Sequence, residues 1–206
     1  MRERFEEIYA RNEWGHGSGE GSLLFHTLGY IQFLENFIAE NNIRSVVDLG
    51  CGDWQFSQYV NWGEVQYHGY DVVSSVIENN TANYSDDKTE FVLYSGDPSE
   101  LPPADLLIAK DVLQHLSNER VANVLGYLDR FKYALITNSL DHRDGPKNVD
   151  IDDGGFRFLD IRQPPFNIEA EEVFTFSKKR ARNDGSFEND PTFKKNTLRV
   201  KASRSS

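Results

Sequence analysis

The segment Val46-Val47-Asp48-Leu49-Gly50-Cys51-Gly52-Asp53 decides how the rest of the chain is interpreted. The apolar run from Ser45 to Leu49 predicts a buried strand with an acidic residue near its end. A Gly-x-Gly bend follows, and residues 54–61 are predicted to be helical. Glycine has no Cβ, so the backbone at this bend can approach a ligand closely. The N–H groups that open the next helix add partial positive charge. The segment therefore predicts a small-molecule site at the carboxyl edge of a parallel sheet.

A second acid supports a nucleotide-like ligand and argues against a dinucleotide. Asp71 lies 21 residues after Gly50, at the end of another apolar run. Nucleotide-binding βαβ units place the acid that binds ribose hydroxyls at this point. The third glycine of Gly-x-Gly-x-x-Gly would fall at position 55, where this chain has Gln55. Asp48 brings a carboxylate to the pocket, where it would repel a diphosphate but attract an amine and a sulfonium.

The alternation of apolar runs and amphipathic segments predicts an α/β fold. We expect strands near residues 45–49, 66–70, 90–93, 105–109, 132–137, 170–177 and 196–201. Helices are expected near residues 2–12, 23–41, 54–61, 73–82 and 117–130. This order predicts a doubly wound, Rossmann-like, mostly parallel sheet of seven strands, with an antiparallel last strand and helices on both faces.

The length of 206 residues suits one domain with a sizeable core. We divide it into an N-terminal helix and glycine-rich lid over residues 1–22, a cofactor-binding core over 23–140, and a substrate loop with the C-terminal strands over 141–206.

Four motifs, in this order along the chain, resemble the motif series of class I S-adenosylmethionine-dependent methyltransferases. They are Asp48-Leu49-Gly50-Cys51-Gly52, Asp71, Ser95-Gly96-Asp97 and Asp105-Leu106-Leu107-Ile108-Ala109-Lys110-Asp111-Val112. The resemblance implies that the glycine bend holds the methionine part of the cofactor, that Asp71 holds the ribose and that Asp97 reaches the adenine. It also implies that residues 110–115 face the transferred methyl group. Trp54 stands where this family often has a third glycine, so we expect the path of the loop to differ.

A segment with four glycines, from Trp14 to Ser22, precedes the first core helix. It is either a flexible connection or a lid over the cofactor, with Ser18, Ser22 and backbone N–H groups meeting the cofactor's carboxylate. We favour the lid, because a tryptophan and a histidine stand among the glycines. The expected cofactor-binding residues are then Trp14, Ser18, Ser22, Asp48, Gly50, Cys51, Gly52, Asp71, Val72, Asp97, Lys110 and Asp111.

Transfer to a hydroxyl acceptor calls for a base, because a protonated hydroxyl is a poor nucleophile. His115 is the first candidate, since it follows the fourth strand and an imidazole with a pKa of about 6.5 suits proton transfer near neutral pH. It is also a candidate to contact the acceptor. Alternatively, His115 only caps the helix that begins near Ser117. Asp111 is a competing base, or a partner that orients His115.

An acidic loop after the fifth strand contains Asp141 and His142. Oxygen ligands of this kind suit Mg²⁺ or Mn²⁺, which would hold a vicinal diol, so both residues are candidate metal ligands. Asp141 is also an alternative base, and His142 an alternative acceptor contact. However, no fixed metal-ligand spacing is present, and loops rich in aspartate are often solvated turns. Arg157, beside aromatic residues, either binds a sugar or another polar ring or bridges nearby acids.

The charge is unevenly distributed. Nine basic and three acidic residues lie from Lys178 onward, whereas the preceding 177 residues carry 13 and 30. Such an acidic body repels a polyanion, so we do not expect nucleic acid as the substrate. The basic end is expected to be a solvated hairpin loop rather than a nucleic-acid arm.

Other features of the composition bear on the setting of the protein. No apolar run approaches the roughly 18 residues that span a bilayer, and the first residues lack the apolar stretch of a signal peptide. The single cysteine, Cys51, excludes an internal disulfide. We therefore expect a cytoplasmic protein.

The acceptor is the least specified part of the interpretation. The Trp14–Ser22 segment and the Asp-x-Gly-Gly-x-Arg-x-Leu-Asp segment at 152–160 resemble methyltransferases associated with glycan building. This resemblance implies O-methylation of a sugar or glycan by a chain fused to, or working beside, glycosyltransferases. The alternatives are a non-catalytic methyltransferase-like partner subunit, a nucleic-acid methyltransferase and a nicotinamide-dependent reductase of similar fold.

Overall fold

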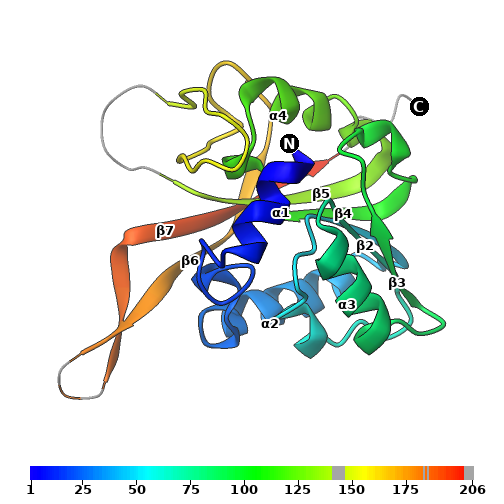
Figure 1. Ribbon diagram of the computed structural model, residues 1–206, viewed down its shortest axis with the longest axis horizontal. Coiled ribbons are helices and arrows are strands. Elements are labelled where there is room, and N and C mark those ends of the chain that lie inside the picture. Colours follow the sequence, from blue (N-terminus) through cyan, green and yellow to red (C-terminus); the bar gives the residue numbers. More distant parts are fainter. Residues whose placement is uncertain (141–146, 183, 185, 202–206) are drawn as a thin grey trace.

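The computed structural model describes residues 1–140, 147–182, 184 and 186–201, whose helices and strands are labelled in Figure 1. The strands are β1 (Ser45–Leu49), β2 (Gln66–Asp71), β3 (Thr89–Leu93), β4 (Ala104–Lys110), β5 (Phe131–Ser139), β6 (Glu171–Ala181) and β7 (Phe187–Lys201). The α-helices are α1 (Arg2–Ala10), α2 (Leu24–Glu40), α3 (Ser74–Tyr84) and α4 (Asn118–Leu125). Short 3₁₀ turns are η1 (Glu20–Ser22), η2 (Ser57–Tyr59), η3 (Pro98–Glu100), η4 (Leu113–His115) and η5 (Leu128–Arg130).

One seven-stranded sheet forms the centre of the domain, in the order β3-β2-β1-β4-β5-β7-β6. The strands β1 to β5 are parallel, and β7 is antiparallel to both of its neighbours. The predicted doubly wound, mostly parallel sheet with an antiparallel last strand is confirmed. The order reverses between β1 and β4, and in open α/β sheets ligands bind outside the carboxyl ends of the strands at such a point.

Alternate residues of the central strands pack into cores on opposite faces of the sheet. Val47 and Leu107 belong to a core that includes side chains of α1 and α4. Their neighbours Val46 and Leu106 belong to a second core, built largely with α2. Because successive side chains of a strand point to opposite faces, a strand covered on both faces reads as a continuous apolar run. Helices therefore lie on both faces, as the sequence predicts.

The predicted helix over residues 54–61 does not form, and only η2 (Ser57–Tyr59) is present there. Trp54 has a positive φ of 57°, which no α-helix contains. This left-handed turn directs the indole into the second core, where it packs against the rings of Tyr67, Tyr84 and Phe91. Burial of a large aromatic ring has therefore overridden the local helical pattern.

The C-terminal strands are longer than predicted and form a hairpin that projects from the rest of the domain (Figure 1). The basic stretch that was expected to be a loop continues the strand pairing, with Lys179 opposite Asn189 and Arg180 opposite Glu188. That expectation is therefore wrong for residues 178–181.

The helix predicted over 117–130 is also shorter, because α4 ends before Gly126 and η5 follows. None of the described helices has both the length and the apolar character that crossing a bilayer requires.

Candidate functional site

A cavity opens at the carboxyl ends of β1 and β4, where the strand order reverses. It encloses about 980 Å³, including its mouth. Eleven of the twelve predicted cofactor-binding residues line it, and so does His115. They are Trp14, Ser18, Ser22, Asp48, Gly50, Cys51, Gly52, Asp71, Val72, Lys110 and Asp111.

The Gly-x-Gly bend has a backbone that other residues adopt only at a cost. Gly50 and Gly52 have φ values of +69° and +56°. A Cβ on Gly50 would collide with the side chain of Val112, and one on Gly52 would collide with Ser18. The glycines therefore allow both the turn itself and the close approach of the segments that cover it.

Asp71 fastens this bend to the end of β2. One carboxylate oxygen accepts a hydrogen bond from the Gly52 N–H at 3.0 Å, and the other accepts from the Val73 N–H at 3.0 Å. Burial raises the pKa of Asp71 to about 6, although the backbone N–H groups oppose the shift. An ionisable group that is shifted by burial in a cavity is a marker of a functional site.

Asp48 is a second buried carboxylate in the cavity. It accepts a hydrogen bond from the Tyr67 hydroxyl at 2.6 Å. Burial raises its pKa to about 6, although the Tyr67 bond and the Lys110 ammonium favour the ionised form. A cationic ligand close to Asp48 would therefore gain more than one at an exposed carboxylate, because low local polarity strengthens the attraction.

The Trp14–Ser22 segment folds onto the bend, and Ser18 is its main attachment. The Ser18 hydroxyl donates to Asp53 at 2.6 Å and lies 2.7 Å from the Tyr9 hydroxyl. It also accepts from the Asp53 N–H at 2.9 Å. Farther along the segment, the Lys110 ammonium donates to the Gly21 carbonyl at 3.0 Å. The segment that was predicted to be a lid therefore lies against the cavity, and its role as a lid stays a prediction.

Asp111 follows β4 and carries a concentrated charge pair. It has a positive φ of 61°, and one of its oxygens accepts from the Lys110 ammonium at 2.8 Å and from the Lys195 ammonium at 2.5 Å. Burial favours the protonated carboxyl, but the two ammonium groups outweigh it and hold the pKa of Asp111 well below its ordinary value. Asp111 is therefore a poor proton acceptor near neutral pH.

His115 ends the turn η4 and contacts two aromatic rings. Its ring centroid lies 4.9 Å from that of Trp14 and 5.8 Å from that of Phe156. Its Nδ1 lies 2.6 Å from the Gly155 carbonyl, and its Nε2 lies 3.3 Å from the amide nitrogen of Gln114. Burial lowers the pKa of His115, so the imidazole is neutral at physiological pH.

Helix capping, the alternative role for His115, is carried out by two acidic residues. Asp153 accepts from the Ser117 N–H at 3.0 Å, and Asp150 accepts from the Asn118 N–H at 2.7 Å. Here their carboxylates stabilise the beginning of α4.

Two predicted site residues lie away from the cavity. Asp97 is exposed and accepts from the Ser99 N–H at 2.9 Å, while its neighbour Gly96 lines the cavity. Arg157 is buried and donates to the Leu116 carbonyl at 2.7 Å and to the Val149 carbonyl at 2.9 Å. It ties the 147–158 segment to the turn that follows η4.

The metal site remains without support from the described part of the chain. Within residues 1–140, 147–182, 184 and 186–201, no three histidine, cysteine or acidic side chains gather into a group that would hold a metal ion. Asp141 and His142 lie outside the described residues.

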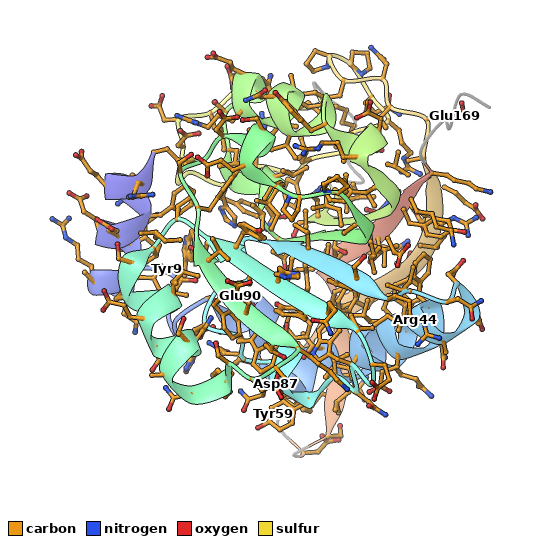
Figure 2. The ribbon with its side chains drawn as sticks, turned by 90° about the vertical axis from the view of Figure 1, so that its right-hand side faces the viewer. Tyr9, Arg44, Tyr59, Asp87, Glu90 and Glu169 are labelled. Carbon is orange, nitrogen blue, oxygen red and sulfur yellow. The ribbon has the colours of Figure 1, made fainter. Side chains whose placement is uncertain are left out.

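Sequence reasoning missed several residues that the fold brings to the cavity. Met1 lines it, as do Phe5 and Tyr9 of α1 and Arg120 of α4. Figure 2, which faces the β3 edge of the sheet, labels Tyr9 on α1. The apolar spacing of α1 predicted a helix, but nothing local indicated which part of the molecule it would cover. Lys195 comes from β7 and reaches Asp111 only through the sheet order.

The sequence matches no protein-family model and no curated protein. Solved structures do resemble it. Magnesium protoporphyrin IX methyltransferase (ChlM) from Synechocystis PCC 6803, with bound SAH, aligns with a TM-score of 0.62 at 14% identity, covering 98% of this chain and 98% of that chain. TehB from Haemophilus influenzae aligns with a TM-score of 0.57 at 17% identity, over 84% of this chain. This alignment spans only 61% of the TehB chain.

The methyltransferase domain of bacterial CtHen1-CN gives a TM-score of 0.54 at 12% identity, covering 83% of this chain and 97% of that chain. At such low identities these likenesses show the fold. The chain has the Rossmann-like fold of the methyltransferases to which it is similar.

Replacing Asp48 with asparagine should change how stability depends on pH. Burial raises the pKa of Asp48 from 3.8 to about 6, so its contribution to stability is fully present below pH 3.8 and is lost as the pH rises to about 6. Asparagine does not ionise, so the variant does not lose this stability as the pH rises. Above pH 7, Asp48→Asn should raise the free energy of unfolding by roughly 1–3 kcal/mol, measured by urea denaturation. A difference from wild type that is the same at pH 5 and pH 8 would contradict this account.

Replacing Asp53 with alanine should loosen the lid. The change removes the acceptor of two hydrogen bonds from Ser18. Since each bond contributes about 1 kcal/mol, amide hydrogen exchange over residues 14–22 should accelerate roughly tenfold or more. Asp87→Ala, at an exposed position labelled in Figure 2, is the matched control. Equal exchange in both variants would mean that Ser18 does not hold the lid.

Proposed function

We propose that this chain is an S-adenosylmethionine-dependent methyltransferase that transfers a methyl group to a hydroxyl of a small polar acceptor. The observation that carries the proposal is the pairing of a glycine bend with two buried carboxylates, Asp48 and Asp71, in one cavity at the switch point of the sheet. Two of the similar structures, both of ChlM, contain bound SAH or SAM. Their fold supports the assignment.

The residues of the cavity suit such a cofactor. Gly50 and Gly52 line the cavity, and their lack of a Cβ lets Val112 and Ser18 lie close against the bend. Each oxygen of Asp71 accepts one backbone N–H and retains a lone pair that can accept from a ribose hydroxyl. Asp48 supplies negative charge for a cationic ligand.

When bound, S-adenosylmethionine would supply a methyl group on its sulfonium; the acceptor oxygen would bond to that methyl as the carbon–sulfur bond breaks, and S-adenosylhomocysteine would leave as a neutral thioether. The protein's part is to orient the acceptor and remove its proton. His115 is neutral, lines the cavity and has one ring nitrogen fixed by the Gly155 carbonyl. The Gln114 contact at Nε2 is the longer of its two, so the acceptor hydroxyl would replace it and transfer its proton there.

The lid and α1 would keep water from the reacting groups. Trp14 packs against Phe5, Tyr9 and His115, and Ser18 holds the segment to the bend through Asp53. Exclusion of water prevents loss of the methyl group to hydrolysis and strengthens the electrostatic contacts in the cavity.

A sugar or glycan is our first candidate for the acceptor. Phe156, with 47% of its surface exposed, lies beside His115 and provides a flat face on which a sugar ring can pack. Arg157 remains a proposed acceptor contact only if the acceptor extends toward the 147–158 segment. A glycosyltransferase acting on the same glycan is the partner that this proposal implies.

The cofactor assignment is tested by calorimetry on the full chain. S-adenosylmethionine and S-adenosylhomocysteine should bind, whereas a nicotinamide dinucleotide should not. Asp48→Asn should weaken binding of the cationic donor about tenfold at pH 7.5. It should weaken binding of S-adenosylhomocysteine, whose sulfur is neutral, by less. Binding of the dinucleotide in place of the donor would overturn the proposal.

The role of His115 is tested by turnover with labelled donor and a panel of saccharides. His115→Ala should reduce turnover by about 10²-fold or more, because the base is lost, while donor affinity stays nearly unchanged. Label transferred only to protein or RNA would replace the proposed acceptor class. Wild-type turnover in the variant would mean that another group removes the proton.

A further inference from the structure

Gln114 is a buried amide with three polar neighbours. Only 4% of the residue is exposed. Its Oε1 lies 2.8 Å from the Ser139 N–H, while its Nε2 lies 3.3 Å from an oxygen of Asp111 and 3.3 Å from Nε2 of His115. The side chain thus connects the ends of β4 and β5 with the proposed base.

Two of these neighbours determine which way the amide points. The Ser139 backbone N–H is only a donor, so the atom that faces it must be the carbonyl oxygen. The Asp111 carboxylate is ionised and only accepts, so the atom that faces it must be the amide nitrogen. A flipped amide would place donor against donor at Ser139 and acceptor against acceptor at Asp111. Both contacts therefore require the same orientation.

This orientation determines the proton positions on His115. Its Nδ1 faces the Gly155 carbonyl and must donate, whereas its Nε2 faces an amide N–H and must accept. We propose that Gln114 is a positioning residue that, together with the Gly155 carbonyl, holds His115 in the tautomer with Nδ1 protonated and Nε2 unprotonated. The catalytic meaning of this tautomer rests on the proposed function, but the tautomer itself does not.

Protonation of His115 in the resting protein is opposed by the same contact. An imidazolium would present a second N–H toward the Gln114 N–H, and the amide cannot turn to relieve the conflict. The carboxylate of Asp111 favours the protonated ring, and the ammonium of Lys195 opposes it. On the elements packed nearby, Lys110 is paired with Asp111, Asp153 with Arg120, and Arg157 is bonded to the Leu116 carbonyl.

The tautomer can be read directly from the ¹⁵N spectrum of the imidazole nitrogens in the full chain. The chain has five histidines, and His115→Gln identifies the signals of interest. In the wild-type protein Nδ1 should be the protonated nitrogen and Nε2 the bare one. The reverse pattern would overturn the proposal whatever the enzyme's activity.

Two substitutions at the same position test the contribution of Gln114 itself. Gln114→Met keeps the length of the side chain without its polar groups. The Gly155 carbonyl still holds Nδ1 protonated, but Nε2 no longer faces an N–H group, so His115 should titrate at a higher pH than in the wild type. Gln114→Glu places a carboxylate beside Nε2, which should raise the pH at which His115 titrates by about 1–3 units. If both variants keep the wild-type titration, Gln114 does not position His115.

The activity of the same variants separates this proposal from the one on which it rests. The acidic limb of the pH profile of kcat/KM should move to higher pH in Gln114→Glu and less in Gln114→Met, with donor affinity unchanged in both. Matching NMR shifts without transfer to any hydroxyl would leave the tautomer assignment standing and remove the O-methylation proposal. Coincident pH profiles for all three proteins would contradict a positioning role.

Discussion

The carboxylate of Asp71 binds the backbone N–H groups of Gly52 and Val73, and this bridge joins the end of β1 to the end of β2. These hydrogen bonds hold the Gly-x-Gly bend that follows β1 in its shape. Burying this carboxylate costs free energy, because burial disfavours the ionised form and raises the pKa of Asp71 to about 6. Asp48, near the end of β1, is also a buried carboxylate, and burial raises its pKa to about 6 as well. A ligand with hydrogen-bond donors or positive charge would offset the cost of burying these two carboxylates, and this is why they point to function.

The end of β4 is the second point on which the site depends. Asp111 receives two ammonium groups there, and one of them, on Lys110, also holds the lid through the Gly21 carbonyl. The lid is attached separately to the glycine bend through Ser18 and Asp53. Segments that are far apart in the sequence thus meet around a single cavity. A change in the position of the lid would therefore alter the contacts of Lys110 and Asp111 at the end of β4.

The 147–158 segment shows how the same residues can serve packing instead of ligand binding. Asp150 and Asp153 cap α4, and Arg157 donates to the Leu116 carbonyl in the turn before that helix. These contacts press the segment against η4, where the Gly155 carbonyl reaches His115. Acidic and guanidinium groups were read as candidate ligands because residue type alone does not reveal a partner. Several of their partners here are backbone groups, which carry no signature in the sequence, and Asp153 also pairs with Arg120.

The sequence by itself determined the α/β alternation, the glycine bend, and the two acids at the ends of β1 and β2, because each depends on a local pattern of apolar, glycine and acidic residues. It also placed His115 after β4. Only the tertiary structure decided that Trp54 turns into a core instead of starting a helix, and that α1 covers the cavity. It likewise brought Lys195 to Asp111 and Gln114 to His115. These outcomes depend on which strands become neighbours and which ring is buried, and long-range packing of this kind overrides local propensity.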